Sequence, residues 1–235
     1  MNCTKAMSTV TSHTEKFPPG PRIRILALAG PVEALLVFAG ILLYIWRWQF
    51  SYPRAGVILL ATVLVASHLV HRDTLASMGL AQSNLRASAQ IVLPLALGIF
   101  IPLTIYGLAS GTFRLLLPAR RVLISFAGYG IWCVFQQYLM QSYIHNRLMG
   151  VVHNRHLSSA LTALMFGAAH IPNPILMVAT TAGGFILAEV FARHRNIWPL
   201  ALAQTLGGLL IAALAPAPLI HNMRVGPGYF FFGLR

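Results

Sequence analysis

Seven long apolar runs, separated by short polar segments, constrain the fold of this sequence more than any other feature. A helix that crosses a bilayer needs about 20 mainly apolar residues, with a range of about 17–25. Only 9% of the residues are charged, against about 25% in soluble domains. We therefore predict an all-α, polytopic membrane helix bundle of about seven to eight transmembrane helices. The runs are residues 25–46, 55–70, 89–108, 122–144, 157–171, 174–192 and 197–214.

The fifth run is short for a membrane span, and the two ends of the sequence are polar or broken. We expect 157–171 to be tilted, re-entrant or buried among its neighbours. Residues 1–24 form a polar tail with no apolar core, so they are not a signal peptide. Residues 25–214 then make up one membrane-embedded domain, and residues 215–235 form a C-terminal tail interrupted by proline and glycine. Cys133 lies in an apolar run and is expected to be a packed core thiol.

The charged residues are mostly basic and lie between the apolar runs. There are 17 lysines and arginines against four acids, but no basic stripe interleaved with aromatic residues, which argues against a nucleic-acid partner. Basic loops beside apolar spans are typical of contact with anionic lipid headgroups, so the lipid bilayer is the expected partner. With seven spans, the tail and the loops 72–87, 146–156 and 193–195 share one side and carry 10 of the 17 basic residues. This bias favours a cytoplasmic N-terminus, and the compact design suggests a bacterial inner membrane.

Amide and imidazole side chains inside three apolar runs are the candidate functional groups. Gln137, Gln141 and His145 recur every four residues and share one helix face, and Gln136 lies about 100° around the helix from Gln137. Hydrocarbon offers no water to such groups, so they are expected to face a partner, a cavity or a site. Gln204 and His170 come from two other runs. The pattern predicts a polar site in the middle of the bundle.

His170 ends its helix, because Pro172 and Pro174 follow it and proline cannot donate a backbone hydrogen bond. Unlike Gln136, Gln137, Gln141 and Gln204, it titrates near neutral pH. Two interpretations remain open, a functional base or a helix-end histidine bonded to a carbonyl. Asn173 is expected to be a turn residue, with lining of the site as the alternative.

The first two acids of the apolar region have local interpretations. Glu33 follows Pro31 at the expected start of a helix, where a carboxylate is favoured by the helix dipole, although a buried functional acid is the alternative. Asp73 is expected to cap a helix or to pair with its neighbour Arg72.

Glu189 and Arg147 lie near the ends of later runs. Glu189 is expected to pair with Arg193 four residues on, and the alternative is that Glu189 supplies a catalytic carboxylate. Arg147, with His145 and Asn146, is expected to lie at the membrane interface and to extend toward the headgroups.

The order of these residues resembles the CAAX prenyl protease and bacteriocin-immunity (Abi) membrane proteins, known as the CPBP family. The family's first motif, two glutamates followed after three residues by arginine, falls on Gln136, Gln137 and Gln141. Its second motif is a phenylalanine four residues before a histidine, and Phe166 and His170 match it fully.

The family's third motif pairs a histidine with an asparagine four residues later. It falls on Gln204 and Gly208, after a glycine-rich helix and a short loop of the expected form. The resemblance covers roughly residues 70–215 and implies a CAAX-protease-like helix bundle. It also implies an intramembrane endopeptidase that acts on prenylated or other membrane-embedded peptides.

The residues at the motif positions argue against the family's usual chemistry. In the family a glutamate is thought to activate water with the help of histidines, which requires a group that accepts a proton near neutral pH. Glutamine offers a carbonyl acceptor and an NH₂ donor but does not titrate, so glutamate-based proteolysis is not expected here. A lone histidine among amide oxygens is also a poor zinc site, so we expect neither a metal nor another cofactor.

Four interpretations of the site remain. The first is a hydrolase or related transferase that uses His170, with Glu189 as a possible carboxylate. The second is a catalytically silent protein that holds a membrane-embedded or lipidated peptide in an amide-lined pocket. In the third, the amides only bond the helices to one another. The fourth, a small transporter, has least support because the sequence shows no repeat.

Overall fold

The computed structural model describes residues 21–114 and 119–231, except for the side chains of 21–28, 119–125 and 217, and the described part is all-α. Most of the predicted tail 1–24, including Cys3, lies outside the described residues. The principal helices are α1 (Pro21–Leu43), α3 (Pro53–His71), α4 (Leu85–Ala109), α5 (Ala119–Gln137), α7 (Arg155–Ala168), α8 (Pro174–His194) and α9 (Trp198–Leu214). Shorter helical pieces are η1 (Tyr44–Trp48), α2 (Gln49–Ser51), η2 (Tyr138–His145), α6 (Asn146–Met149), α10 (Ala217–Ile220), η3 (His221–Met223) and η4 (Gly226–Tyr229).

Several of these helices are suited to a bilayer. Within the described residues, four helical segments are long and apolar enough to span a membrane: Ala29–Ser51, Pro53–His71, Leu85–Ala109 and Pro174–His194. The shorter α9 is also apolar. The chain is therefore a multi-pass membrane protein, while the full number of seven to eight spans stays a prediction. The short run 157–171 forms α7, which has only 14 residues.

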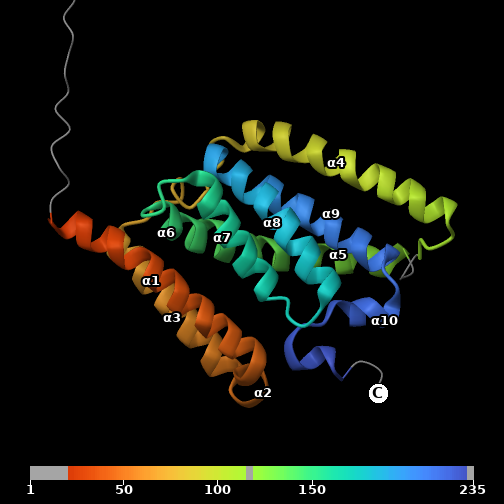
Figure 1. The fold of residues 1–235 in the computed structure, drawn as a ribbon, viewed down its shortest axis with the longest axis horizontal. Helices are drawn as coiled ribbons and strands as arrows, with labels where there is room; N and C mark the ends of the chain where they lie inside the picture. The colour runs from red at the N-terminus through yellow and green to blue at the C-terminus, as the bar shows by residue number, and fades with distance from the viewer. Residues whose placement is uncertain (1–20, 115–118, 232–235) are drawn as a thin grey trace, which may run out of the picture.

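Two helices form a hairpin at one edge of the bundle. Figure 1 shows α1 and α3 side by side, joined through η1 and α2. The two helices can approach closely because residue 56 is glycine. A Cβ atom at this position would lie 2.8 Å from Tyr44 Cδ2, which is too close. The helix α1 begins at Pro21, so Pro31 and Glu33 are in its interior and the expected helix start at Pro31 is wrong.

The remaining helices pack around α5 and its continuation through η2 and α6. The pair α7 and α8 forms a tight antiparallel hairpin, and α9 lies between α4 and α5. One apolar cluster joins η2 to α1 and α7 through Tyr143, Ala34 and Phe166. A second joins α4, α8 and α9 through Val92 and Phe191, and Tyr138 packs against both clusters. Cys133 is fully buried, as expected for a core thiol.

Three connecting segments meet at one end of the bundle. Asn146 donates to the Ser77 carbonyl at 2.9 Å, and Arg195 donates to Asn146 Oδ1 at 3.0 Å. The Asn196 side chain donates to the carbonyl of Ala81. The segments 72–84, 146–154 and 195–197 therefore come together, and they overlap the loops 72–87, 146–156 and 193–195 that the charge distribution assigns to one side. The surface of these three segments is called the loop face below.

Candidate functional site

Three glutamines from two helices form a hydrogen-bonded row. Gln137 Nε2 donates to Gln204 Oε1 at 2.6 Å, and Gln204 Nε2 donates to Gln136 Oε1 at 2.6 Å. Gln136 and Gln137 end α5, and Gln204 lies in α9, which packs along α5. Gln137 is fully buried, whereas Gln136 and Gln204 are partly exposed. The structure thus brings together two motif positions that lie 67 residues apart, and the row is called the amide row below.

The helix geometry changes directly after this row. From Tyr138 to His145 the chain forms a π-helix, a wide turn that often occurs at functional sites. Gln141 Oε1 accepts a hydrogen bond from His145 Nδ1 at 3.1 Å, so these two members of the predicted stripe are in contact. Both side chains are fully buried. The expected place of His145 at the membrane interface is therefore wrong.

His170 bonds to the backbone near the end of α7. Its Nδ1 donates to the carbonyl oxygen of Phe166 at 2.8 Å, and the two rings meet edge to face. Thr180 Oγ1 lies 3.4 Å from the same nitrogen. Among the described residues no hydrogen bond joins His170 to a glutamine. The contact is that of a helix-end histidine bonded to a carbonyl, which was one of the two interpretations.

Glu189 pairs across the helical hairpin and not along its own helix. Its Oε2 lies 3.1 Å from Arg155 Nε, and its Oε1 lies 3.1 Å from His156 Nδ1. Arg193 is exposed and makes no ion pair within residues 21–114 and 119–231. The predicted Glu189–Arg193 pair is therefore wrong, because the start of α7 lies closer to the carboxylate than the next turn of α8 does.

Asp73 belongs to a partly buried polar chain that the sequence did not predict. Arg147 Nη2 lies 2.6 Å from Asp73 Oδ2, and His68 Nδ1 lies 2.7 Å from the same oxygen. His68 Nε2 in turn lies 2.8 Å from the hydroxyl of Tyr138. The expected pair between Asp73 and Arg72 is wrong. Arg147 does not extend to the headgroups either, because its side chain is only 6% exposed.

The electrostatic state of Asp73 follows from these partners. Burial alone would raise the pKa of this carboxyl, but hydrogen bonds from Arg147 and His68 outweigh burial and hold the pKa below its ordinary value. Asp73 is thus held as a carboxylate between two donors.

Glu33 extends the same network into α1. Its carboxylate accepts from Ser67 Oγ at 2.7 Å and lies 3.1 Å from His71 Nε2. Arg147 Nε is 3.9 Å from Glu33 Oε2. Glu33 is therefore not a first-turn carboxylate as expected but a link between α1, α3 and α6. The sequence gives only a weak sign of this polar network, because all it shows is His68 and His71 one turn apart at the end of an apolar run.

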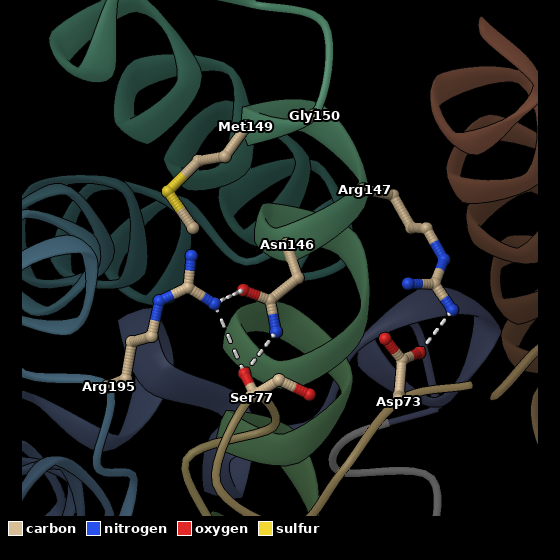
Figure 2. Close-up of a pocket in the computed structure, with 7 residues that line it drawn as sticks. All are labelled: Asp73, Ser77, Asn146, Arg147, Met149, Gly150 and Arg195. Carbon is tan, nitrogen blue, oxygen red and sulfur yellow. Dashed lines mark hydrogen bonds and ion pairs between the residues drawn. The ribbon is translucent and has the colours of Figure 1, made fainter. Parts of the chain in front are cut away.

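An open pocket of about 210 Å³ lies on the loop face, beside this network. Figure 2 shows Arg195 and Asn146 both directed at Ser77, while Arg147 turns away toward Asp73. The charged groups of the pocket are therefore already paired or hydrogen-bonded to the protein. The lining residues are Asp73, Ser77, Asn146, Arg147, Met149, Gly150 and Arg195.

Metal binding finds no support in the described part of the chain. Within residues 21–114 and 119–231, no three His, Cys, Asp or Glu side chains gather in a way that could hold a metal ion. The chemistry available to the amide row is hydrogen bonding, since its members are amides that donate and accept but do not titrate.

Comparison with known protein families bears on the resemblance seen in the motifs. The family described as type II CAAX prenyl endopeptidase, Rce1-like, matches residues 118–210. This segment runs from α5 into α9 and contains each of the candidate residues, namely Gln136, Gln137, Gln141, His170, Glu189 and Gln204. No curated protein and no solved structure matches the chain significantly. The resemblance found in the motifs is confirmed over a shorter range than expected, and residues 118–210 form an Rce1-like domain of the type II CAAX prenyl endopeptidase family.

Proposed function

We propose that this membrane protein holds a membrane-embedded or lipidated peptide against its buried amides and does not carry out glutamate-dependent proteolysis. The observation that carries the proposal is the amide row, in which Gln137 and Gln136 both bond to Gln204. By the resemblance, these positions correspond to two glutamates and a histidine in the family. A general base must accept a proton near the working pH, and an amide does not.

The amides offer groups that complement a peptide backbone. Gln137 Oε1 is an acceptor and Gln141 Nε2 is a donor, and neither has a hydrogen-bond partner among the described residues. They lie four residues apart, on either side of the junction between α5 and η2. A peptide carries an N–H and a C=O at each residue, so one segment can bond to both. Gln136 and Gln204 are partly exposed, which connects the row with the protein surface.

A hydrolase that uses His170 together with Glu189 is the competing function. The contacts of these residues give it less support, because Glu189 is paired with Arg155 and His156. His170 is bonded to the Phe166 carbonyl.

We also propose that the N-terminus and the loop face lie in the cytoplasm of a bacterium. The excess of basic residues on that side supports this orientation.

The test is a capture experiment with purified protein in lipid nanodiscs. Photo-crosslinking peptides with and without a prenyl group are presented to the wild type and to Gln137→Leu and Gln141→Leu. Gln90→Leu is the matched control, because Gln90 is exposed on α4 and makes no hydrogen bond within the described residues. We expect weaker capture in the first two variants and unchanged capture in the control. Equal capture by all four proteins would rule out the amides as the binding surface.

A cleavage assay on the same peptides separates binding from catalysis. We expect the wild type to leave the peptides intact. Cleavage by the wild type that disappears in His170→Ala would instead establish the hydrolase. Gln137→Glu is included because it restores one motif carboxylate, so cleavage by this variant alone would show that the bound peptide lies in a catalytic geometry.

A further inference from the structure

Arg195 is a cation of the loop face that forms no ion pair within residues 21–114 and 119–231. Its Nη1 donates to the carbonyl oxygen of Ser77 at 3.3 Å and to Asn146 Oδ1 at 3.0 Å. Both acceptors are neutral, so these bonds position the guanidinium without neutralising its charge. Its Nε and Nη2 groups make no hydrogen bond within the same residues, which leaves one edge of the guanidinium fork free for a ligand.

Contacts at both ends of this side chain hold it in place. At the backbone, Gly79 packs so closely that a Cβ atom there would lie 3.0 Å from the carbonyl carbon and oxygen of Arg195. At the guanidinium, the acceptor Asn146 is itself fixed, because its Nδ2 donates to the carbonyls of Ser77 and Ser142, each at 2.9 Å. A donor that is already positioned loses little conformational freedom when it binds a ligand.

The guanidinium of Arg195 lines the open pocket of about 210 Å³ on the loop face (Figure 2). Arg147 and Asp73 also line this pocket, but they form an ion pair with 2.6 Å between Nη2 and Oδ2, so their charges offset each other. The remaining lining residues are neutral. Arg195 therefore gives the pocket a net positive charge, which suits a small anionic group.

The pocket lies at the ends of two candidate membrane spans. One span ends at His71, two residues before Asp73, and another ends at His194, directly before Arg195. Trp198, at the start of α9, is 45% exposed, and tryptophan is enriched where a membrane meets water. The phosphate groups of phospholipids occupy this depth, and basic pockets between membrane helices are suited to such headgroups.

We infer that the loop-face pocket binds the phosphate group of a membrane phospholipid, with Nε and Nη2 of Arg195 as paired donors. Two neighbouring N–H groups of arginine match two oxygens of a phosphate, and charge assistance makes such hydrogen bonds stronger than neutral ones. The inference is independent of the proposed peptide binding, because the pocket contains none of the glutamines of the amide row.

The test is native mass spectrometry of the purified protein in detergent, titrated with phosphatidylglycerol. Arg195→Gln removes both the charge and the fork. Arg193→Gln is the matched control, because it removes the same charge from the same end of α8, at an exposed residue without an ion pair within the described residues. We expect Arg195→Gln to weaken binding of the first lipid roughly tenfold or more, and Arg193→Gln to bind like the wild type. Equal affinity in all three proteins, or equal loss in both variants, would overturn the inference.

A second pair of variants leaves Arg195 in place, should Arg195→Gln not fold. Gly150 is exposed and lines the pocket, so Gly150→Glu adds a carboxylate that repels a phosphate, and Gly150→Ala controls for the added side chain. We expect weaker lipid binding only in Gly150→Glu, and equal binding by these two variants would contradict the site.

Inorganic phosphate, titrated separately, distinguishes a lipid headgroup from a soluble phosphate. We expect it to bind more weakly than phosphatidylglycerol, because it has no acyl chains to bury against the apolar helices. Tighter binding of inorganic phosphate that is lost in Arg195→Gln would assign the pocket to a soluble phosphate and overturn the lipid assignment.

Discussion

Arg147 Nη2 and Asp73 Oδ2 lie 2.6 Å apart, although 74 residues separate them in the sequence. The pair joins α6 to the segment after α3, and Arg147 also lies 3.9 Å from Glu33 in α1. The α1–α3 hairpin exposes many large apolar side chains, such as Leu36 and Leu69. Charged contacts therefore contribute to holding this hairpin against the domain that carries the amide row.

Loss of Arg147 is expected to destabilise the protein strongly. Arg147→Ala leaves the Asp73 carboxylate, with 14% of its side chain exposed, without its closest cation. Removal of one partner of a buried ion pair costs about 3–5 kcal/mol. Thermal unfolding in detergent should show a large decrease in Tm.

Arg193→Ala is the control for this prediction, because Arg193 is exposed and unpaired within the described residues, and its effect is expected to stay within about 0.5 kcal/mol. The double variant Arg147→Ala/Asp73→Asn should recover part of the lost stability, since it also removes the charge of Asp73. An Arg147→Ala protein as stable as Arg193→Ala would mean that the pair contributes nothing.

Stability is expected to fall at low pH because of Asp73. Its pKa in the folded protein lies below the ordinary value, so the folded state favours the carboxylate. The stabilisation is present in full above the unfolded pKa of about 3.9 and is lost as pH falls through the folded pKa. Unfolding measured between neutral pH and pH 3 should show a steeper loss in the wild type than in Asp73→Asn. Parallel curves for the two proteins would contradict this assignment.

The contacts that sequence reasoning predicted are local ones. Gln141 and His145 lie four residues apart, and helix geometry alone brings such residues together. Phe166 and His170 match a motif with the same spacing, and their rings are in contact for the same reason. Gln137 and Gln204 are an exception, because the sequence places both in one polar site in the middle of the bundle and the structure joins them although they lie 67 residues apart.

The contacts that sequence reasoning missed join distant segments. In the sequence Arg72 is the nearest basic partner for Asp73. In the structure the partner is Arg147, which comes from another helix. Glu189 likewise has Arg193 one turn away, yet it pairs with Arg155 across the hairpin. Helix packing decides these choices, and periodicity along the chain does not specify which faces of two helices meet.

Gly167 is expected to be essential to the α7–α8 hairpin. A methyl group at this position would lie 3.1 Å from the Met177 carbonyl oxygen and would overlap the Thr181 hydroxyl. Gly167→Ala should therefore destabilise the protein by about 1–3 kcal/mol through overpacking. In Gly183→Ala the new methyl group meets no atom within 4 Å, so improved helix propensity should stabilise the protein by up to about 1 kcal/mol. Thermal unfolding of the two variants tests the opposite signs, and equal effects would contradict the packing argument.

Asn173 is expected to hold the C-terminal segment against the α7–α8 turn. Its Nδ2 donates to the carbonyls of Ile220 at 2.7 Å and Arg224 at 3.2 Å, and its Oδ1 caps α8 by accepting from Leu176 N. The side chain is fully buried, so it is more than the turn residue that the sequence predicted. Asn173→Ala removes the cap and leaves two carbonyls without their donor. Trypsin should then cleave after Arg224 faster than in the wild type.

Two further variants separate the roles of this side chain. Asn173→Asp keeps an oxygen for the cap but cannot donate to the carbonyls, so cleavage after Arg224 should still accelerate. Asn154→Ala removes the equivalent cap of α7, where Asn154 Oδ1 accepts from Leu157 N and makes no other side-chain bond within the described residues. Its loss should cost about 1 kcal/mol without changing the cleavage rate. Cleavage that accelerates equally in Asn154→Ala would show that general destabilisation, and not release of the C-terminal segment, exposes Arg224.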